Sequence, residues 1–302
     1  MSTDPAPFRC SAASLAATEP LEGTASTVRS FLLLENRGPW GVHALRGGRL
    51  DPAVQDWLAQ VESHGTRPLL VRRPRRSSSD GGAGTQVFAA TVGPPATLVG
   101  TVLDSPADLL GLDPAAVTRA GALGMEPHAG PLFLACTHGK HDACCAELGR
   151  PLANALSSAA PEQTWEVSHI GGDRFAPNVL VLPHGLYYGR LLPAEAGALV
   201  AAHLDGRLDL EHLRGRSSYP FAVQAAEIHL RRHLGHFDAT APRLMEHLRD
   251  GGLTTVVLEA AGGRWRVQVQ TRRSEPSRLT CRSTSPSAPL RHALLGIEQL
   301  NA

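Results

Sequence analysis

The sequence predicts an α/β protein built around a mixed sheet. Short apolar runs typical of buried strands alternate with segments whose apolar residues recur at helical spacing. This succession occurs twice before about residue 205, each time as strand, helix, three strands and helix. Such an order is typical of a mixed sheet with helices on its faces, as in a thioredoxin-like layout. We therefore expect a thioredoxin-like second half and a first half that repeats its element order.

The first half opens on an apolar run at 31–35, which the turn residues Asn36-Arg-Gly-Pro39 end. A helix follows, with Asp51 as its cap and Pro52 in its first turn. Its apolar residues recur at helical spacing, which predicts one buried face. Further strands are expected at 68–72, 86–91 and 96–103, and a further helix from about residue 107.

The second half repeats this order from residue 132. The apolar run 132–136 predicts a strand that ends on Cys136. The remaining elements are a helix at 144–157, strands at 164–168, 178–182 and 186–190, and a helix at 194–204.

From about residue 206 the chain changes character, and we expect a small α+β appendage. Two alternating runs, 253–259 and 264–270, predict a hairpin across a glycine-containing turn. We expect helices at 220–234, 241–250 and 288–300, and a short strand at 279–282.

Composition excludes several classes of protein. The chain has 302 residues, 42% of them hydrophobic and 19% charged, with a net charge of +1. No apolar run approaches the ~20 residues that span a bilayer, and the N-terminus lacks the pattern of a signal peptide. The basic run 72–76 has no interleaved aromatic residues, so we expect neither nucleic acid nor a membrane as partner. Five cysteines, three of them clustered, favour reduced thiols or metal ligands in the cytoplasm.

Two short segments carry the candidate site. Cys136-Thr-His-Gly-Lys-His-Asp-Ala-Cys144-Cys145 follows one predicted strand, and His169-Ile-Gly-Gly-Asp173 follows the next. Because these strand ends are expected to be neighbours, Cys136, Cys145, His169 and Asp173 should converge. Thiolates and imidazole gathered in this way suit an iron–sulfur or zinc centre. The helix that starts near Cys145 would favour its thiolate.

The other cysteines and histidines have simpler interpretations. Cys144 points about 100° away from its neighbour on a helix, so we expect a small buried hydrophobe, as for Cys10 and Cys281. His138 and His141 are expected to be solvated loop residues. The short knuckle of a structural zinc site and the C-x-x-C of a dithiol are both absent.

The segments 134–152 and 165–190 resemble the sucrase/ferredoxin-like family, and segments 10–25, 38–41 and 223–227 also match its pattern. The resemblance implies a thioredoxin-like ferredoxin domain with a [2Fe–2S] cluster held by two cysteines and two histidines. Cys136, Cys145 and His169 match this ligand pattern, but Asp173 stands where the family has its second histidine. The domains expected on this basis are 1–125, a candidate degenerate thioredoxin-like half, 126–205, the ferredoxin domain, and 206–302, the appendage.

The departure at Asp173 leaves the fourth ligand open. Asp173 is our preferred fourth ligand. One alternative is that Cys144 or a loop histidine takes its place. Another is that the cluster is weak or absent. No paired-carboxylate site of a glycosidase can be identified, so the family name does not predict sucrase activity.

We expect an electron carrier rather than a catalyst: an iron–sulfur protein for electron transfer or redox sensing, acting with an unidentified redox partner. Histidine ligation would raise the cluster's potential and allow electron transfer to couple to proton transfer. One alternative is a thiol-based redox enzyme that uses Cys144 or Cys145 on the thioredoxin-like scaffold. Another is a cluster-free or zinc-binding module.

Overall fold

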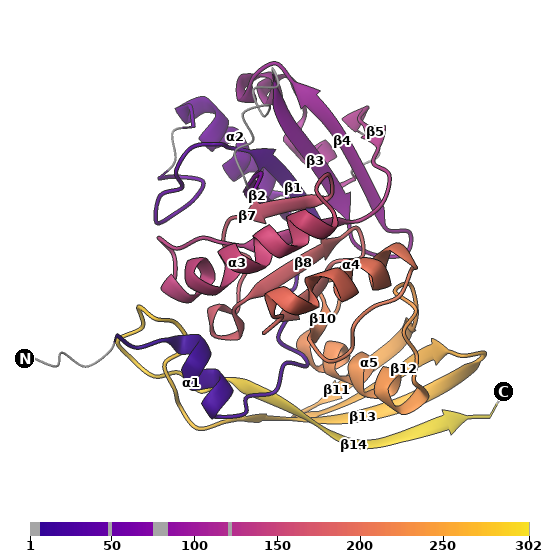
Figure 1. Ribbon diagram of the computed structural model, residues 1–302. Coiled ribbons are helices and arrows are strands. Elements are labelled where there is room, and N and C mark those ends of the chain that lie inside the picture. The colour runs from indigo at the N-terminus through magenta and orange to yellow at the C-terminus, as the bar shows by residue number, and fades with distance from the viewer. Residues whose placement is uncertain (1–6, 48–49, 75–83, 120–122, 302) are drawn as a thin grey trace, which may run out of the picture.

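A computed structural model gives the fold of the chain, and it describes residues 7–47, 50–74, 84–119 and 123–301. Part of the basic run, from residue 75, lies outside the described residues. A ten-stranded mixed sheet forms the larger body, and a four-stranded antiparallel sheet lies beside it (Figure 1). The strand order of the large sheet is β10-β9-β8-β6-β7-β2-β1-β3-β4-β5. The predicted mixed α/β fold is therefore confirmed.

The two halves of the large sheet share one topology. The first contains β1 (Ser30–Glu35), α2 (Pro52–Ser63), β2 (Thr66–Arg72), β3 (Thr85–Thr91) and β4 (Thr97–Leu103). The second contains β6 (Leu132–Cys136), α3 (Ala143–Ala159), β7 (Thr164–Val167), β8 (Asn178–Leu182) and β9 (Leu186–Gly189). In each half the first strand pairs parallel with the second and antiparallel with the third, which pairs antiparallel with the fourth. The repeat inferred from element order is thus present in the strand pairing.

The halves join where β2 runs antiparallel to β7, and they share one core. Residues on the helix-free faces of both halves pack into a single apolar cluster that includes Phe31, Leu134 and Trp165. The opposite face of the first half packs on α2, and that of the second half packs on α3 and on α4 (Ala196–Leu204). Because both faces are covered, the central strands are continuous apolar runs, which is why the sequence located them.

The C-terminal region departs furthest from expectation. After β10 (Leu213–Arg216) and α5 (Phe221–Leu234), the small sheet has the order β11 (Arg243–Asp250), β12 (Leu253–Ala260), β13 (Gly263–Arg273) and β14 (Leu290–Leu300). The hairpin is confirmed. The helices predicted at 241–250 and 288–300 are wrong, because these segments are the edge strands of this sheet. The strand predicted at 279–282 is wrong as well, since these residues form an irregular turn.

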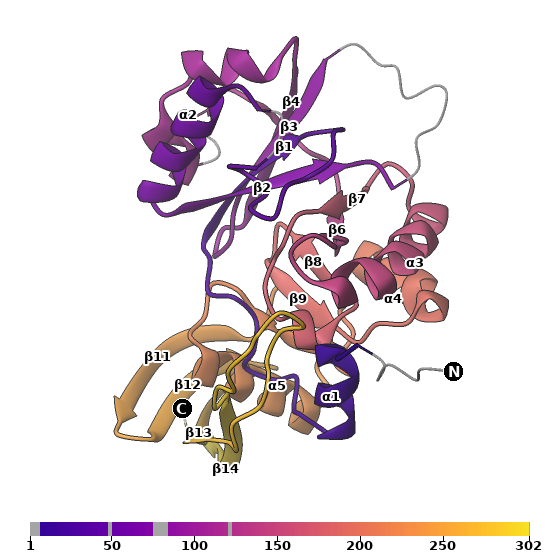
Figure 2. The ribbon, with the colours of Figure 1, turned by 90° about the vertical axis from the view of Figure 1, so that its left-hand side faces the viewer.

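Short elements complete the chain. Among the described residues these are α1 (Cys10–Ala16), β5 (Glu126–Pro127) and the 3-10 turns Pro106–Gly111, Pro114–Thr118, Asp173–Phe175 and Pro193–Glu195. The helix expected from residue 107 is the first of these turns. Helix α1 lies against the connection between β13 and β14, so residues as far apart in the sequence as Cys10 and Cys281 meet there (Figures 1 and 2). Within the described residues, no helix is long and apolar enough to cross a membrane.

Candidate metal centre

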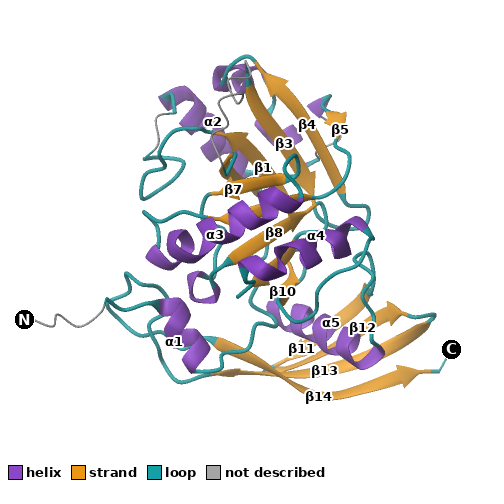
Figure 3. Cartoon of the chain, in the orientation of Figure 1, coloured by secondary structure: helices purple, strands orange, loops and turns teal. Residues whose placement is uncertain are grey.

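Two neighbouring strand ends position the first group of donors. Strands β6 and β7 are parallel and adjacent, with Cys136 paired opposite Val167, so the residues that follow them leave the sheet at the same edge. Asp142 ends the loop after β6 and caps α3, because its Oδ1 accepts the backbone N–H of Cys144 at 2.9 Å. This cap starts α3 at Ala143, so Cys145 lies in the first turn of a helix that packs against β6 and β7 (Figure 3).

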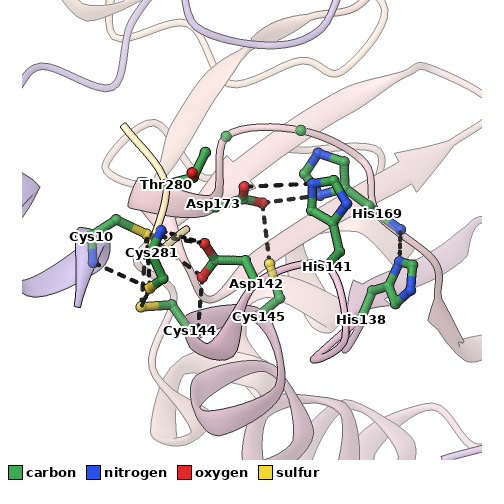
Figure 4. A network of polar contacts seen from close by, with 12 residues as sticks. Cys10, His138, His141, Asp142, Cys144, Cys145, His169, Asp173, Thr280 and Cys281 are labelled. Atoms are coloured by element: carbon green, nitrogen blue, oxygen red, sulfur yellow. Dashed lines mark hydrogen bonds and ion pairs between the residues drawn. The ribbon is translucent and has the colours of Figure 1, made fainter. Parts of the chain in front are cut away.

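The four predicted donors lie close together, although no single donor group contains them all. Ligand atoms of Cys136, Cys145 and His169 all lie within 4.8 Å of one another. Asp173 Oδ1 is 2.9 Å from His169 Nδ1 and accepts the thiol of Cys145 at 3.3 Å. Figure 4 shows Cys145 and Asp173 facing the histidines at the start of α3.

The two loop histidines differ from the prediction. His141 stacks on His169 with ring centroids 3.6 Å apart, and its Nε2 lies 3.8 Å from Asp173 Oδ2. His138 is buried, with its Nε2 2.6 Å from the carbonyl oxygen of Gly41. Its Nδ1 accepts the backbone N–H of His169. The prediction that both are solvated is wrong for His138, which is buried and orients the loop that carries His169. His141 is partly exposed, but it also joins the donor group.

Two arginines hold the loop between His169 and Asp173. Arg67 donates to the carbonyl oxygens of His169 at 2.9 Å and Ile170 at 3.2 Å. Arg214 is buried and donates to the carbonyl oxygen of Gly171 at 3.0 Å. Burial lowers the pKa of Arg214 to about 10, which still leaves it charged near neutral pH. Sequence reasoning missed both arginines, because neither lies near the donors in the chain.

Glycine is required at the tight end of this loop. Gly172 has a φ of +79°, and a Cβ at this position would overlap the Arg214 guanidinium, with Cζ only 2.6 Å away. The loop therefore needs both the conformational freedom and the missing side chain of glycine. This places Asp173 in a 3-10 turn with its carboxylate toward the donors.

The four donors differ in charge, and only Cys136 and Asp173 are in the deprotonated form that binds metals. The hydrogen bond from Cys145 holds the pKa of Cys136 well below its usual range against the effect of burial, and His169 adds to this. The pKa of Cys145 is raised, first by its hydrogen bond with Cys136 and then by burial of its thiol. Burial lowers the pKa of His169, but Asp173 and Cys136 outweigh it and raise that pKa to about 9. Burial raises the pKa of Asp173, but His169 and His141 outweigh it, so its pKa is low and the carboxylate is charged.

The histidine side of the centre faces solvent, whereas the thiols are enclosed. The side chain of His141 is 35% exposed and that of His169 24%, but that of Asp173 only 3%. A groove of about 370 Å³ opens beside the histidines, lined partly by residues 42–46. A molecule in solution therefore reaches the donors past the imidazole rings of His141 and His169.

Cys144 belongs to a different group of residues. Its Sγ lies near the sulfur atoms of Cys10 and Cys281, while the adjacent Cys145 turns to the first group (Figure 4). The prediction that Cys144 is buried and points away from its neighbour is correct. The prediction of a small buried residue is confirmed for Cys10, whereas Cys281 is only partly buried, and both lie against Cys144. Nothing in their local sequence indicated this contact.

Together, the fold and this centre define a thiol-rich mixed α/β protein with clustered donors at the ends of neighbouring strands. Residues 21–215 match the sucrase/ferredoxin-like family, and the chain belongs to that family. No curated protein and no solved structure gives a significant match to it. The thioredoxin-like assignment and the three domain boundaries stay predictions.

Proposed function

We propose that the chain binds a [2Fe–2S] cluster and acts in electron transfer or redox sensing. The observation that carries this proposal is the meeting of two buried thiols, an imidazole and a carboxylate at one edge of the sheet. The proposed ligands are Cys136, Cys145, His169 and Asp173. Family membership and the βαβββ order of both halves support it, since the family name includes ferredoxins.

The residues present fit such a group. His169 Nδ1 is buried and lies 2.9 Å from Asp173 Oδ1, which places two kinds of metal-ligand atom, an imidazole nitrogen and a carboxylate oxygen, side by side. Cys136 as thiolate and Asp173 as carboxylate are already in the deprotonated forms that bind metals. When bound, the cluster would supply a one-electron carrier.

The protein's own residues would tune that carrier in two ways. The backbone carbonyls of the His169–Asp173 loop are fixed by Arg67 and Arg214, whose positive charges favour the more negative, reduced state. The enclosed thiols are kept from water, while the exposed imidazole edge of His169 is the route for electrons. A redox partner protein would therefore dock at the groove beside His138 and His141.

The remaining parts of the proposal concern cellular context. Clustered thiols without a disulfide among the described cysteines favour a reducing compartment, so we propose a cytoplasmic location. Electron transfer needs no substrate pocket at the centre, and we propose a carrier rather than a catalyst. The buried, divergent thiols of Cys144 and Cys145 do not favour a thiol enzyme that uses this pair, because an attacking thiol must be accessible.

The test is an iron and sulfide assay with EPR on protein purified without oxygen. We expect two irons and two sulfides per chain and a rhombic signal after reduction. Asp173→Ala and His141→Ala decide the fourth ligand, since only loss of a ligand should change the EPR g values. Ser11→Ala is a matched control at a nearby residue that contacts the other cysteine group.

Protein that contains no iron after anaerobic reconstitution would overturn the proposal. If His141→Ala changes the spectrum and Asp173→Ala does not, the cluster assignment stands but its fourth ligand is His141. The distance of 3.8 Å between His141 Nε2 and Asp173 Oδ2 makes this the alternative that the geometry favours.

A further inference from the structure

A second group of thiols lies on the other side of the start of α3. Cys10 comes from the first turn of α1, Cys144 from α3, and Cys281 from the turn between β13 and β14. Their Sγ atoms are 3.8 Å apart for Cys10 and Cys144, 3.4 Å for Cys144 and Cys281, and 3.6 Å for Cys10 and Cys281. Three segments separated by more than a hundred residues thus converge on one point (Figure 4).

These distances match the spacing of sulfur ligands around one tetrahedral metal ion. With metal–sulfur bonds of about 2.3 Å, tetrahedral geometry puts two sulfur ligands about 3.8 Å apart. A disulfide would instead need one pair to close to about 2.05 Å and would leave the third thiol without a role. Three nearly equal Sγ–Sγ distances fit three thiolates bound to one metal ion better than a disulfide between any two of them.

Asp142 completes the set. Its oxygens lie 3.6 and 3.7 Å from the Sγ of Cys10, and the carboxylate is 1% exposed. It accepts the backbone N–H groups of Cys144 and Cys281, at 2.9 and 2.7 Å. No ion pair to a lysine, arginine or histidine balances its charge among the described residues. A buried charge without a counter-charge is costly, so a cation is the missing partner.

The surroundings of the sulfurs are also those of metal thiolates. The backbone N–H of Cys10 donates to the Sγ of Cys281 at 3.5 Å, and the hydroxyl of Ser11 donates to the Sγ of Cys144 at 3.1 Å. Such donors stabilise negative sulfur and orient it toward a metal.

We propose that Cys10, Cys144, Cys281 and Asp142 form a closed tetrahedral site for one zinc ion, separate from the candidate cluster centre. Three thiolates and one carboxylate fill the coordination of zinc, which marks a structural site rather than a catalytic one. The ion joins α1 and the β13–β14 connection to α3, directly beside Cys145. It therefore fixes α1 and the β13–β14 connection on the part of the fold that carries the candidate cluster centre. The proposal does not depend on the cluster.

The first experiment measures zinc in the full-length chain, purified without chelator, by elemental mass spectrometry. We expect one zinc per chain in the wild type and in Cys136→Ser, which removes a thiol of the other centre. Cys10→Ser and Cys281→Ser should each lose the zinc while the protein stays folded by circular dichroism. Zinc lost from Cys136→Ser but kept in Cys10→Ser would overturn the proposal by assigning the ion to the first centre.

A second measurement covers the case in which Cys10→Ser or Cys281→Ser fails to fold. The full-length Cys136→Ser variant is stripped of metal and titrated with Co²⁺, so that no iron–sulfur absorption overlaps the signal. We expect saturation at one Co²⁺ per chain, with the intense visible and sulfur-to-metal bands of a tetrahedral thiolate site, reversed by zinc. Absence of these bands, or a disulfide between any two of the three cysteines in the purified wild type, would refute the site.

Discussion

Replacing Gly172 with alanine should destabilise the protein by far more than its backbone angle explains. The left-handed conformation alone costs an alanine about 1–2 kcal/mol. The added Cβ must also displace the guanidinium of Arg214, which donates to Gly171, Asn178 and Thr24 at 3.0, 2.8 and 2.6 Å. Bonds from a charged donor contribute about 1.5–3 kcal/mol each, so losing two costs about 3 kcal/mol or more. We expect a total loss of about 4–5 kcal/mol.

The matched control is Gly206→Ala. Gly206 has a similar φ of +69°, but no atom lies within 4 Å of the position of its Cβ. The control should lose only the conformational part, about 1–2 kcal/mol. Urea denaturation of the full chain, followed by tryptophan fluorescence, measures both variants. If the two variants lose the same free energy, Arg214 does not hold the loop and our account of the His169–Asp173 geometry is wrong.

Three further predictions concern buried charge. Burial lowers the pKa of His203 from 6.5 to about 4, so its contribution to stability is present above pH 6.5 and lost as the pH falls toward 4. The wild type should therefore lose about 2 kcal/mol more than His203→Gln between pH 7 and pH 5, measured by urea denaturation at each pH. Glu227→Gln removes a carboxylate that two buried arginines share, and should cost about 3–5 kcal/mol in the same assay. Arg67→Met removes a positive charge beside the loop of His169, and should make the reduction potential of the reconstituted cluster more negative in a redox titration.

For each of these three predictions, one result would contradict it. Equal pH slopes for the wild type and His203→Gln would mean that the pKa of His203 does not change on folding. A loss below about 1 kcal/mol for Glu227→Gln would mean that its ion pairs behave as solvated surface pairs. An unchanged potential in Arg67→Met, with Arg46→Met as a control from the same groove, would show that the charge of Arg67 is screened from the centre.

Local sequence patterns were sufficient where an element is covered on both faces. The central strands β1, β6 and β8 are buried throughout and each contains a run of at least four apolar residues, a composition that does not depend on which neighbour covers them. The edge strands β11 and β14 were mistaken for helices because most of their residues are exposed, so no buried face marks a strand period in the sequence. Their mixed sequences fit either periodicity, and only pairing with β12 and β13 decides between them.

The candidate centre shows the same division. The sequence alone named Cys136, Cys145, His169 and Asp173, because two parallel neighbouring strands must deliver the residues after them to one edge. Whether these residues bind a cluster stays a prediction. Only the tertiary structure added His141 and the arginines, and only it brought Cys10 to Cys281 across 271 residues. Periodicity and capping residues determine the conformation of nearby residues. Contacts between distant parts of the chain depend on how folded elements pack against one another, and a local sequence pattern holds no information about that packing.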